Sequence, residues 1–64
     1  MTDVGRILRN RARCKKCGDI IESKHRHDHV ACSCGEIAVD GGLAYLRRTF
    51  NRPENLEEMA EHGE

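Results

Sequence analysis

The sequence predicts a small β protein that needs a cross-link, and three observations lead to this fold class. The chain has 64 residues, which suffices for one domain but buries too little apolar surface for stability without help. It contains no Trp, one Tyr and one Phe, and 34% of its residues are charged, so a large aromatic core is excluded. Its four cysteines form two close pairs, which can supply the cross-link as a metal site or as disulfides.

The cellular compartment favours a metal site. Residues 1–13 contain no apolar run of signal-peptide length, and no segment is apolar enough to span a bilayer. We therefore expect a cytoplasmic protein, in which reducing conditions keep thiols free. Closely spaced cysteines in such a protein indicate metal ligands before disulfides.

The spacing of the cysteines predicts a tetrahedral site. One pair is C-x2-C, the other is C-x-C, fourteen residues separate them, and glycine directly follows each pair. The pattern resembles two zinc knuckles, in which both thiolates point to one side of a turn and glycine takes the positive φ. We predict one Zn²⁺ per chain, in a small metal-stabilised β fold of the zinc-ribbon type. Its ligands would be Cys14, Cys17, Cys32 and Cys34.

Other ligand sets stay open at this point. The second pair is one residue tighter than C-x2-C, and His25, His27 and His29 lie close enough for one of them to replace a cysteine. Two disulfides are a further arrangement, and iron could occupy a four-sulfur site. The alternating histidines would share one face of an extended segment, where they could bind a second metal or respond to pH.

Two hairpins are expected around the cysteine pairs. A short strand at residues 11–13 leads into the first pair, and the β-prone run at residues 19–23 leads out of it. The polar residues 23–29 form a loop. Strands at residues 30–33 and 36–40 then enclose the second pair as a second hairpin.

A third strand is expected at residues 43–50. The preceding residues 40–42, Asp-Gly-Gly, are typical of a tight hairpin turn, which favours a strand. A helix would instead bring Leu43, Leu46 and Phe50 onto one face. The apolar residues available to a core are chiefly Ile20, Ile21, Val30, Ile37, Val39, Leu43 and Leu46.

Charge and composition divide the chain into a basic N-terminal arm (1–10), a zinc-ribbon domain (11–50) and an acidic C-terminal tail (51–64). All 11 Lys and Arg precede residue 54, with six acids among them, whereas the last eleven residues hold five acids and no base. Pro53 and Glu54 suit the first turn of a helix, but a helix of about ten residues is marginal alone in water. The tail is therefore expected to be a short helix or to be disordered.

The charge asymmetry indicates a surface for nucleic acid or for an acidic partner. Contacts to phosphates would come from Arg6, Arg9, Arg11, Arg13, Lys15 and Lys16. Lys15, Lys16 and Arg13 would also offset the negative charge of a four-thiolate site. Aromatic side chains that stack on bases are almost absent, which counts against single-strand binding.

The region RCKKCGDIIESKHRHDHVACSCGEIAVDGGLAYLRR, residues 13–48, resembles a family of very small zinc-ribbon proteins of uncharacterised function from bacteria and their phages. The most specific pieces are CKKCGDIIES, the His-rich segment, CSCG, and the VDGG turn followed by YLRR. The resemblance implies a zinc-ribbon fold and a phage or prophage protein that modulates or inhibits a bacterial machine. It implies no functional residues beyond the metal ligands.

Three functions follow as hypotheses. The first is a protein-binding module for a bacterial or phage protein, with Tyr45, Leu46, Arg47 and Arg48 as contact residues. The second is a DNA- or RNA-binding zinc ribbon that uses the basic N-terminal half. The third is a second-metal or enzymatic site on the histidines. We expect no enzyme, because the sequence has no nucleophile triad, phosphate loop or recognisable carboxylate pair.

Overall fold

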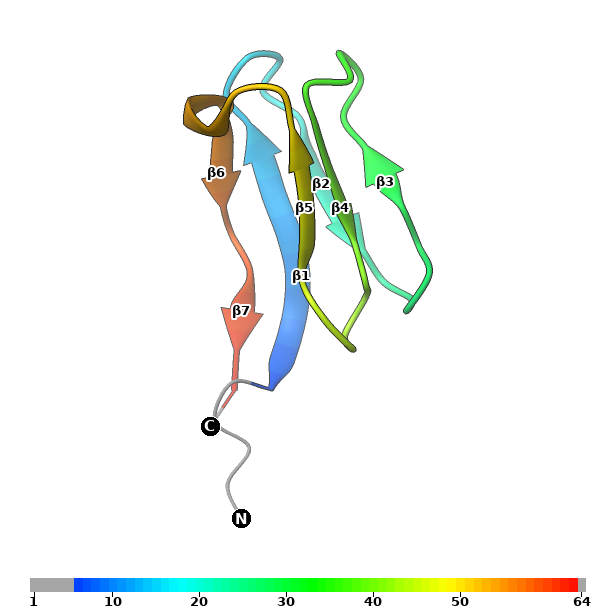
Figure 1. The fold of residues 1–64 in the computed structure, drawn as a ribbon. Coiled ribbons are helices and arrows are strands. Elements are labelled where there is room, and N and C mark those ends of the chain that lie inside the picture. The colour runs from blue at the N-terminus through cyan, green and yellow to red at the C-terminus, as the bar shows by residue number, and fades with distance from the viewer. Residues whose placement is uncertain (1–5, 64) are drawn as a thin grey trace.

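The computed structural model describes residues 6–63, and its first sheet is built around one long central strand (Figure 1). That strand is β1 (Ile7–Cys14), and β2 (Ile20–Ser23) pairs with it antiparallel on one side. Along its other side run β6 (Leu56–Glu58) and β7 (Glu61–His62), both antiparallel to β1. Alternation along β1 buries Asn10, Ala12 and Cys14, as expected for a strand with one face in the core.

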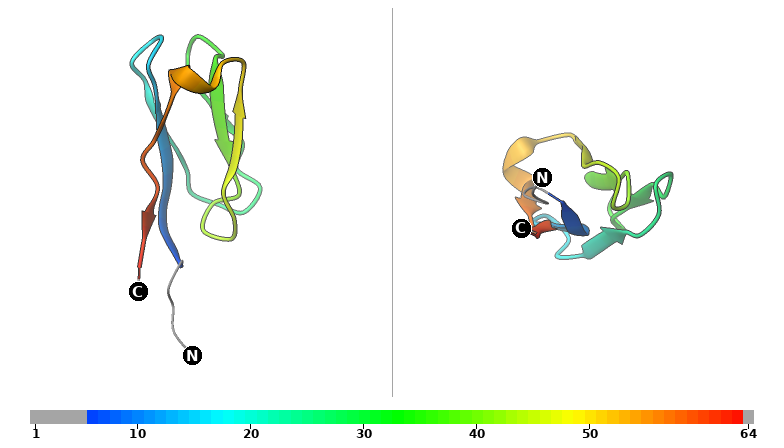
Figure 2. Two further views of the ribbon diagram at one scale, coloured as in Figure 1. Left: turned by 60° about the vertical axis from the view of Figure 1, so that its left-hand side comes forward. Right: turned by 90° about the horizontal axis from the view of Figure 1, so that it is seen from below.

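The second sheet contains β3 (Val30–Ala31), β4 (Ile37–Asp40) and β5 (Arg47–Phe50), antiparallel and in that order. After β5 the chain passes over the cysteine end of the molecule through a 3₁₀ turn, Pro53–Asn55, and enters β6 (Figure 2). The hairpins β1–β2 and β3–β4, and the third strand β5, confirm the predicted small all-β fold.

The core lies between the two sheets. Its buried members are small aliphatic side chains and two of the cysteines, and Val30 and Leu56 pack against them. They are Ala12, Cys14, Ile21, Cys32, Ile37 and Val39. Three residues expected in the core are exposed instead, because Ile20 points outward from β2 while Leu43 and Leu46 lie in the segment before β5. The core is therefore even smaller than the sequence predicts.

The expectation of a C-terminal helix or a disordered tail is wrong for residues 51–63. Apart from the single 3₁₀ turn, this segment is extended and adds β6 and β7 to the open edge of β1. The physical reason is that a short isolated helix gains little, whereas the same residues on a sheet edge gain ladder hydrogen bonds and ion pairs. The acidic segment is thus part of the domain.

The boundary placed after residue 10 also needs correction. Residues 1–5 of the expected basic arm lie outside the described residues, but from Ile7 onward the chain belongs to β1 without a break. The arginines of this region therefore project from a central strand. No helix within residues 6–63 has the length and apolar character that a membrane crossing requires.

Candidate metal centre

The first cysteine pair lies in a turn that closes the end of the β1–β2 hairpin. The N–H of Cys14 donates to the carbonyl of Asp19 at 2.8 Å, and the N–H of Gly18 donates to the carbonyl of Cys14 at 2.7 Å. Gly18 has φ of 85°, a left-handed conformation that costs glycine little and other residues more. The N–H of Cys17 points back to the Cys14 sulfur, with N···Sγ of 3.4 Å. This turn has the geometry predicted for a zinc knuckle.

The second pair lies in a similar but tighter turn between β3 and β4. The N–H of Cys32 donates to the carbonyl of Ile37 at 3.1 Å, and the N–H of Gly35 donates to the carbonyl of Cys32 at 3.0 Å. The bond from the glycine N–H to the carbonyl of the first cysteine joins residues three apart here and four apart in the first turn. This difference accounts for the shorter C-x-C spacing. Gly35 again has a positive φ, 76°. The N–H of Ile37 lies 3.4 Å from the Cys32 sulfur.

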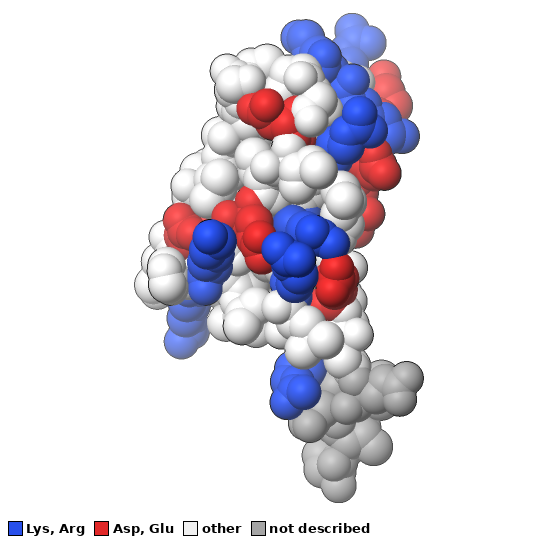
Figure 3. All heavy atoms as spheres, turned by 180° about the vertical axis from the view of Figure 1, so that it is seen from behind, with Lys and Arg blue, Asp and Glu red and all other residues white. Residues whose placement is uncertain are grey.

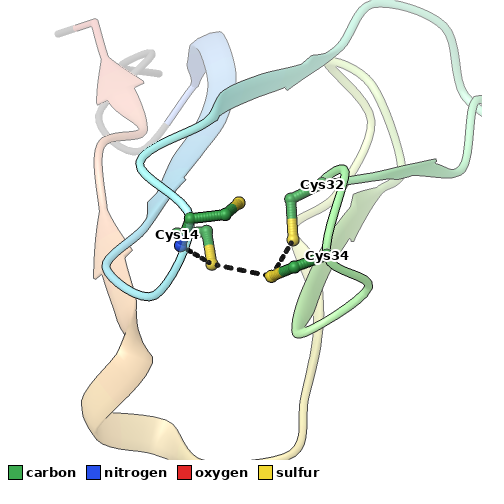
Figure 4. A group of neighbouring side chains, drawn as sticks. Cys14, Cys32 and Cys34 are labelled. Carbon is green, nitrogen blue, oxygen red and sulfur yellow. Dashed lines mark hydrogen bonds between the residues drawn. The ribbon is translucent and has the colours of Figure 1, made fainter.

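The two turns bring all four thiols together (Figure 4). The four Sγ atoms lie within 4.8 Å of one another, and Cys34 Sγ is 3.6 Å from both Cys14 Sγ and Cys32 Sγ. These separations exceed a disulfide bond of about 2.05 Å, and all four cysteines are free. Cys14 and Cys32 are buried, whereas Cys17 and Cys34 are exposed. The cluster sits at one end of the molecule with one side toward solvent.

The donor set fits a tetrahedral metal ion. For four sulfurs at about 2.3 Å from a metal, the edge of the tetrahedron is about 3.8 Å. The two 3.6 Å separations are close to that value. Four thiolates are also the ligand set of closed structural sites. Four cysteines that could hold a metal ion, as predicted, are thus a property of this fold.

Asp19 connects the two turns next to the thiols. Its carboxylate Oδ2 accepts a 2.7 Å hydrogen bond from the N–H of Ser33, which lies between the second pair of cysteines. Hydrogen bonds from Ser33 lower the pKa of Asp19 below its ordinary value, side chain first and backbone second. Because its carbonyl already accepts from Cys14, Asp19 fixes the position of one turn relative to the other.

The thiols have unequal acidity. A hydrogen bond from the backbone of Asp19 is the main cause that lowers the pKa of Cys17 to about 6. For Cys34, the backbone N–H of Glu36 acts in the same direction, but burial and the neighbouring thiols raise its pKa to about 12. A cation bound by all four sulfurs would have to displace that proton, because the thiolate is the ligand form.

A buried carboxylate next to the second turn holds the C-terminal crossing. Glu36 is only 5% exposed, and its Oε2 accepts from the N–H of Arg52 at 2.9 Å and from Nδ2 of Asn55 at 3.1 Å. Its carbonyl accepts from the N–H of Asn51. The bond from Asn55 is the first cause of a pKa lowered from the ordinary glutamate value. Glu36 therefore joins the second cysteine turn to the start of the C-terminal segment by hydrogen bonds.

The three histidines do not join the cysteines. They lie in the β2–β3 loop at the opposite end of the molecule, with exposed side chains. The carbonyl of His25 accepts from the N–H of Asp28, which closes a turn, and His29 lies 4.0 Å from Asp40. In residues 6–63, the four cysteines are the sole group of three or more metal-binding side chains that lie close together. Residues 25–27 form a bend and a turn, so the extended segment that was expected to align the histidines is not formed there.

Three of the arginines proposed for phosphate contacts, Arg9, Arg11 and Arg13, are paired with glutamates. Arg9 contacts Glu22 on β2 at 3.0 Å, while Arg11 and Arg13 contact glutamates of the C-terminal segment. On the face drawn in Figure 3, Lys and Arg side chains are interspersed with Asp and Glu. Lys15 and Lys16 are exposed beside the first turn, and Lys16 lies 4.0 Å from Glu36. Arg6 begins the described chain and accepts through its carbonyl from Gly63.

Arg48 was expected on a contact surface for a partner, but its side chain is largely covered by the protein itself. Its side chain is 11% exposed and reaches across to β1 and β6, so it is a contact within the protein. Tyr45 is half-buried, and the Arg47 guanidinium lies 5.9 Å from the centre of its ring. Leu46 and Arg47 are exposed, as a contact surface requires.

The sequence reasoning missed Asp19, Glu36 and Asn10, which organise the site and the fold. A pattern for two of them was present, because an acid follows the glycine of each cysteine pair: CGD in the first and CGE in the second. In both turns that acid accepts hydrogen bonds from a segment distant in sequence. Nothing comparable distinguishes Asn10 in the sequence.

Fold and site together define a small antiparallel β protein with a four-cysteine cluster that could hold a metal ion. Residues 6–50 match the family described as a domain of unknown function (DUF7695). The chain belongs to this family, because the match covers more than half of its length. No curated protein and no solved structure shows significant similarity to it.

Proposed function

We propose that the chain is a zinc-stabilised protein-binding module. The observation that carries the proposal is the four-sulfur cluster, in which all sulfurs lie within 4.8 Å of one another and two separations are close to the edge of a tetrahedral site. Zn²⁺ is the favoured occupant, because thiolates select it and nothing else in the sequence is typical of a redox protein. With four protein ligands no position is left for a substrate, so the ion has a structural role.

The contact surface that we propose lies at the end opposite the cysteines. We call it the distal surface: Leu43, Leu46 and Arg47, with residues 25–27 of the adjacent loop. Leu43 is 55% exposed and Leu46 37% exposed. The β4–β5 connection and the β2–β3 loop are in close contact, since a Cβ added at Gly42 would lie 2.3 Å from the carbonyl carbon of His25. Exposed leucines beside cations are typical of surfaces that bind acidic, partly apolar partners.

Charge pairing favours a protein partner over nucleic acid. Arg9, Arg11 and Arg13 have carboxylates as neighbours, and a phosphate would have to displace each of them. Binding to DNA and RNA is driven by counterions that are released when protein cations neutralise phosphates. Arginines that already neutralise carboxylates of their own chain gain less from this release. The resemblance to small zinc-ribbon proteins of bacteria and phages makes a larger bacterial or phage protein the expected partner.

Native mass spectrometry tests the metal. We expect one zinc ion per chain in protein purified under reducing conditions, and none after Cys14→Ser or Cys34→Ser. Zinc that stays bound at one per chain in both variants would contradict the four-thiolate site. Iron in the purified protein would retain the site but change its occupant.

Two variants of matched exposure test the surface. Leu43 is 55% exposed at the distal end and Ile20 is 57% exposed on β2 near the cysteines. A protein captured from bacterial lysate is identified, purified and titrated against wild type, Leu43→Ser and Ile20→Ser. We expect Leu43→Ser to weaken binding about tenfold, as loss of a central apolar contact does, and Ile20→Ser to bind like wild type. Equal effects of both variants, or capture of nucleic acid in place of a protein, would overturn the assignment.

A further inference from the structure

We propose that the side of β1 opposite β2 is a docking edge for an extended acidic segment of a partner protein. We call it the arginine edge: the backbone of β1 on that side, with the side chains of Arg11, Arg13 and Arg48. In the structure this chain's own residues 55–63 occupy the edge, and they display the chemistry that it accepts. The edge borders the cysteine end, where Leu56 pairs with Cys14, so its test is made on zinc-loaded protein and reads peptide binding rather than metal content.

The backbone of β1 offers hydrogen bonds along its full length. β6 pairs in register with its end, Glu57 opposite Arg13, and β7 pairs with its beginning. Between the two strands the N–H of Met59 donates to the carbonyl of Arg11 at 3.2 Å. Beyond β6 the N–H of Lys15 donates to the carbonyl of Asn55 at 2.8 Å. Such a ladder binds any extended chain, whatever its sequence.

The arginine side chains add selectivity for carboxylates. Arg13 contacts Glu57 at 3.1 Å, and a second arginine, Arg11, contacts Glu61. Arg48 donates two parallel hydrogen bonds to Glu58, from Nε to Oε1 at 2.8 Å and from Nη2 to Oε2 at 2.6 Å. This two-point geometry matches the planar carboxylate. The edge therefore fits an extended segment with acids at the spacing E-E-x-x-E.

The occupying segment has the features of a replaceable strand. β6 has three residues and β7 has two; none of them is buried, and Leu56 alone among them packs against the core. The register also shifts between Ile7 and Arg9. The match to the family ends at residue 50, before this segment begins. Short exposed strands open at lower free energy than the core.

The segment can leave the edge while the chain stays attached. Glu36 holds residues 51–55 through the N–H of Arg52 and the amide of Asn55, so separation begins beyond that anchor. Opening then exposes three arginines and the backbone of β1 together. A nucleic acid could contact the arginines but could not pair with the strand backbone, so these contacts together favour an acidic peptide.

A peptide in trans tests the proposal on the full-length, zinc-loaded protein. The probe is a fluorescent peptide with the sequence of residues 55–63, titrated against wild type and Glu57→Lys/Glu58→Lys/Glu61→Lys by anisotropy. An attached segment competes at an effective concentration of about 1 mM, so we expect the peptide to bind the variant at least about tenfold tighter than wild type. Glu54→Lys is the control, because within residues 6–63 the salt bridge of Glu54 is with Arg52, and Glu54 lies before β6. It should bind the peptide as wild type does.

Three results would overturn the proposal. The first is a folded triple variant that binds the peptide no tighter than wild type. The second is equal binding of a peptide in which the three glutamates are replaced by Gln. The third is tighter binding of a duplex oligonucleotide than of the acidic peptide.

Should the triple variant not fold, hydrogen exchange on wild-type protein replaces it. The hydrogen-bonded amides of Met59 and Gly63 should exchange faster than those of the β1–β2 ladder, because the segment opens alone. Uniform exchange over both regions would mean that the segment opens only with the whole fold, and would overturn the proposal equally.

Discussion

Arg48 on β5 donates a hydrogen bond of 2.7 Å to Oδ1 of Asn10 on β1, and this contact joins the two sheets. Asn10 is fully buried, and its Nδ2 donates to carbonyls at the end of β4 and in the segment that connects β4 with β5. Those carbonyls belong to Asp40, Gly42 and Tyr45. Asn10 and Arg48 thus connect β1 to the segment between the second and third strands of the other sheet.

Replacement of Asn10 by Ala should destabilise the zinc-loaded protein by roughly 2 kcal/mol or more. Buried carbonyls and the guanidinium of Arg48 would lose a partner, and each unsatisfied buried group costs about 1 to 3 kcal/mol. Urea unfolding of the zinc-loaded protein measures the change. Arg9→Gln removes only an exposed ion pair and serves as the control, for which we expect a small effect. Equal effects would show that Asn10 has no special role.

The pKa of Glu58 should be depressed as long as Arg48 is present. The hydrogen bond from Arg48 lowers this pKa from the ordinary value of 4.5. A carboxylate with a lowered pKa contributes stability above its ordinary pKa and loses it as pH falls through the folded value. Carbon-13 NMR of the carboxyl should give a midpoint below 4.5 in wild type and a higher midpoint in Arg48→Lys, which lacks the two-point grip. An unchanged midpoint would contradict the pairing.

Glu36→Gln should loosen the crossing that leads to β6. The amide keeps the shape but loses the charge that strengthens the bonds from Arg52 and Asn55. We expect faster hydrogen exchange at the amide of Arg52 and a lower melting temperature, with zinc still bound. Glu54→Gln is the matched control, because its carboxylate is exposed. Loss of zinc from Glu36→Gln would mean that the carboxylate supports the thiols directly.

Combined replacement of His25, His27 and His29 by Gln should leave the zinc content at one per chain. The histidines lie at the end opposite the cysteines, and their loop is held by backbone bonds such as that from Asp28 to His25. Metal analysis of the purified triple variant is the measurement. A lower zinc content would place one histidine among the ligands and displace a cysteine.

The elements near the cysteines could be predicted from the sequence, because local chemistry specifies them. C-x2-C-G and C-x-C-G predict turns, and turns fix the strands on either side, as the β1–β2 register shows. The clustering of the four cysteines followed from the same pattern. Ile20 and Ile21 were both expected in the core, because an apolar run does not show which residue faces inward; Ile21 is buried, whereas Ile20 is exposed.

The C-terminal segment could not be predicted, because its structure depends on a strand that precedes it by over forty residues. Pro53 and the glutamates are typical of a helix start, and only the open side of β1 makes a strand the better state. Likewise the arginines were interpreted as a free basic surface. Their glutamate partners come from strands far away in sequence, Arg13 with Glu57 for example.

The account depends most on the claim that the fold requires its metal. A structural zinc ion in a small domain contributes about 10 to 16 kcal/mol to folding, more than this small core can replace. The most direct measurement is the amide NMR spectrum of reduced protein before and after removal of zinc by a strong chelator. We predict that chelation collapses the amide dispersion and that added zinc restores it. Reduced, metal-free protein with native dispersion and an unchanged melting temperature would contradict the claim.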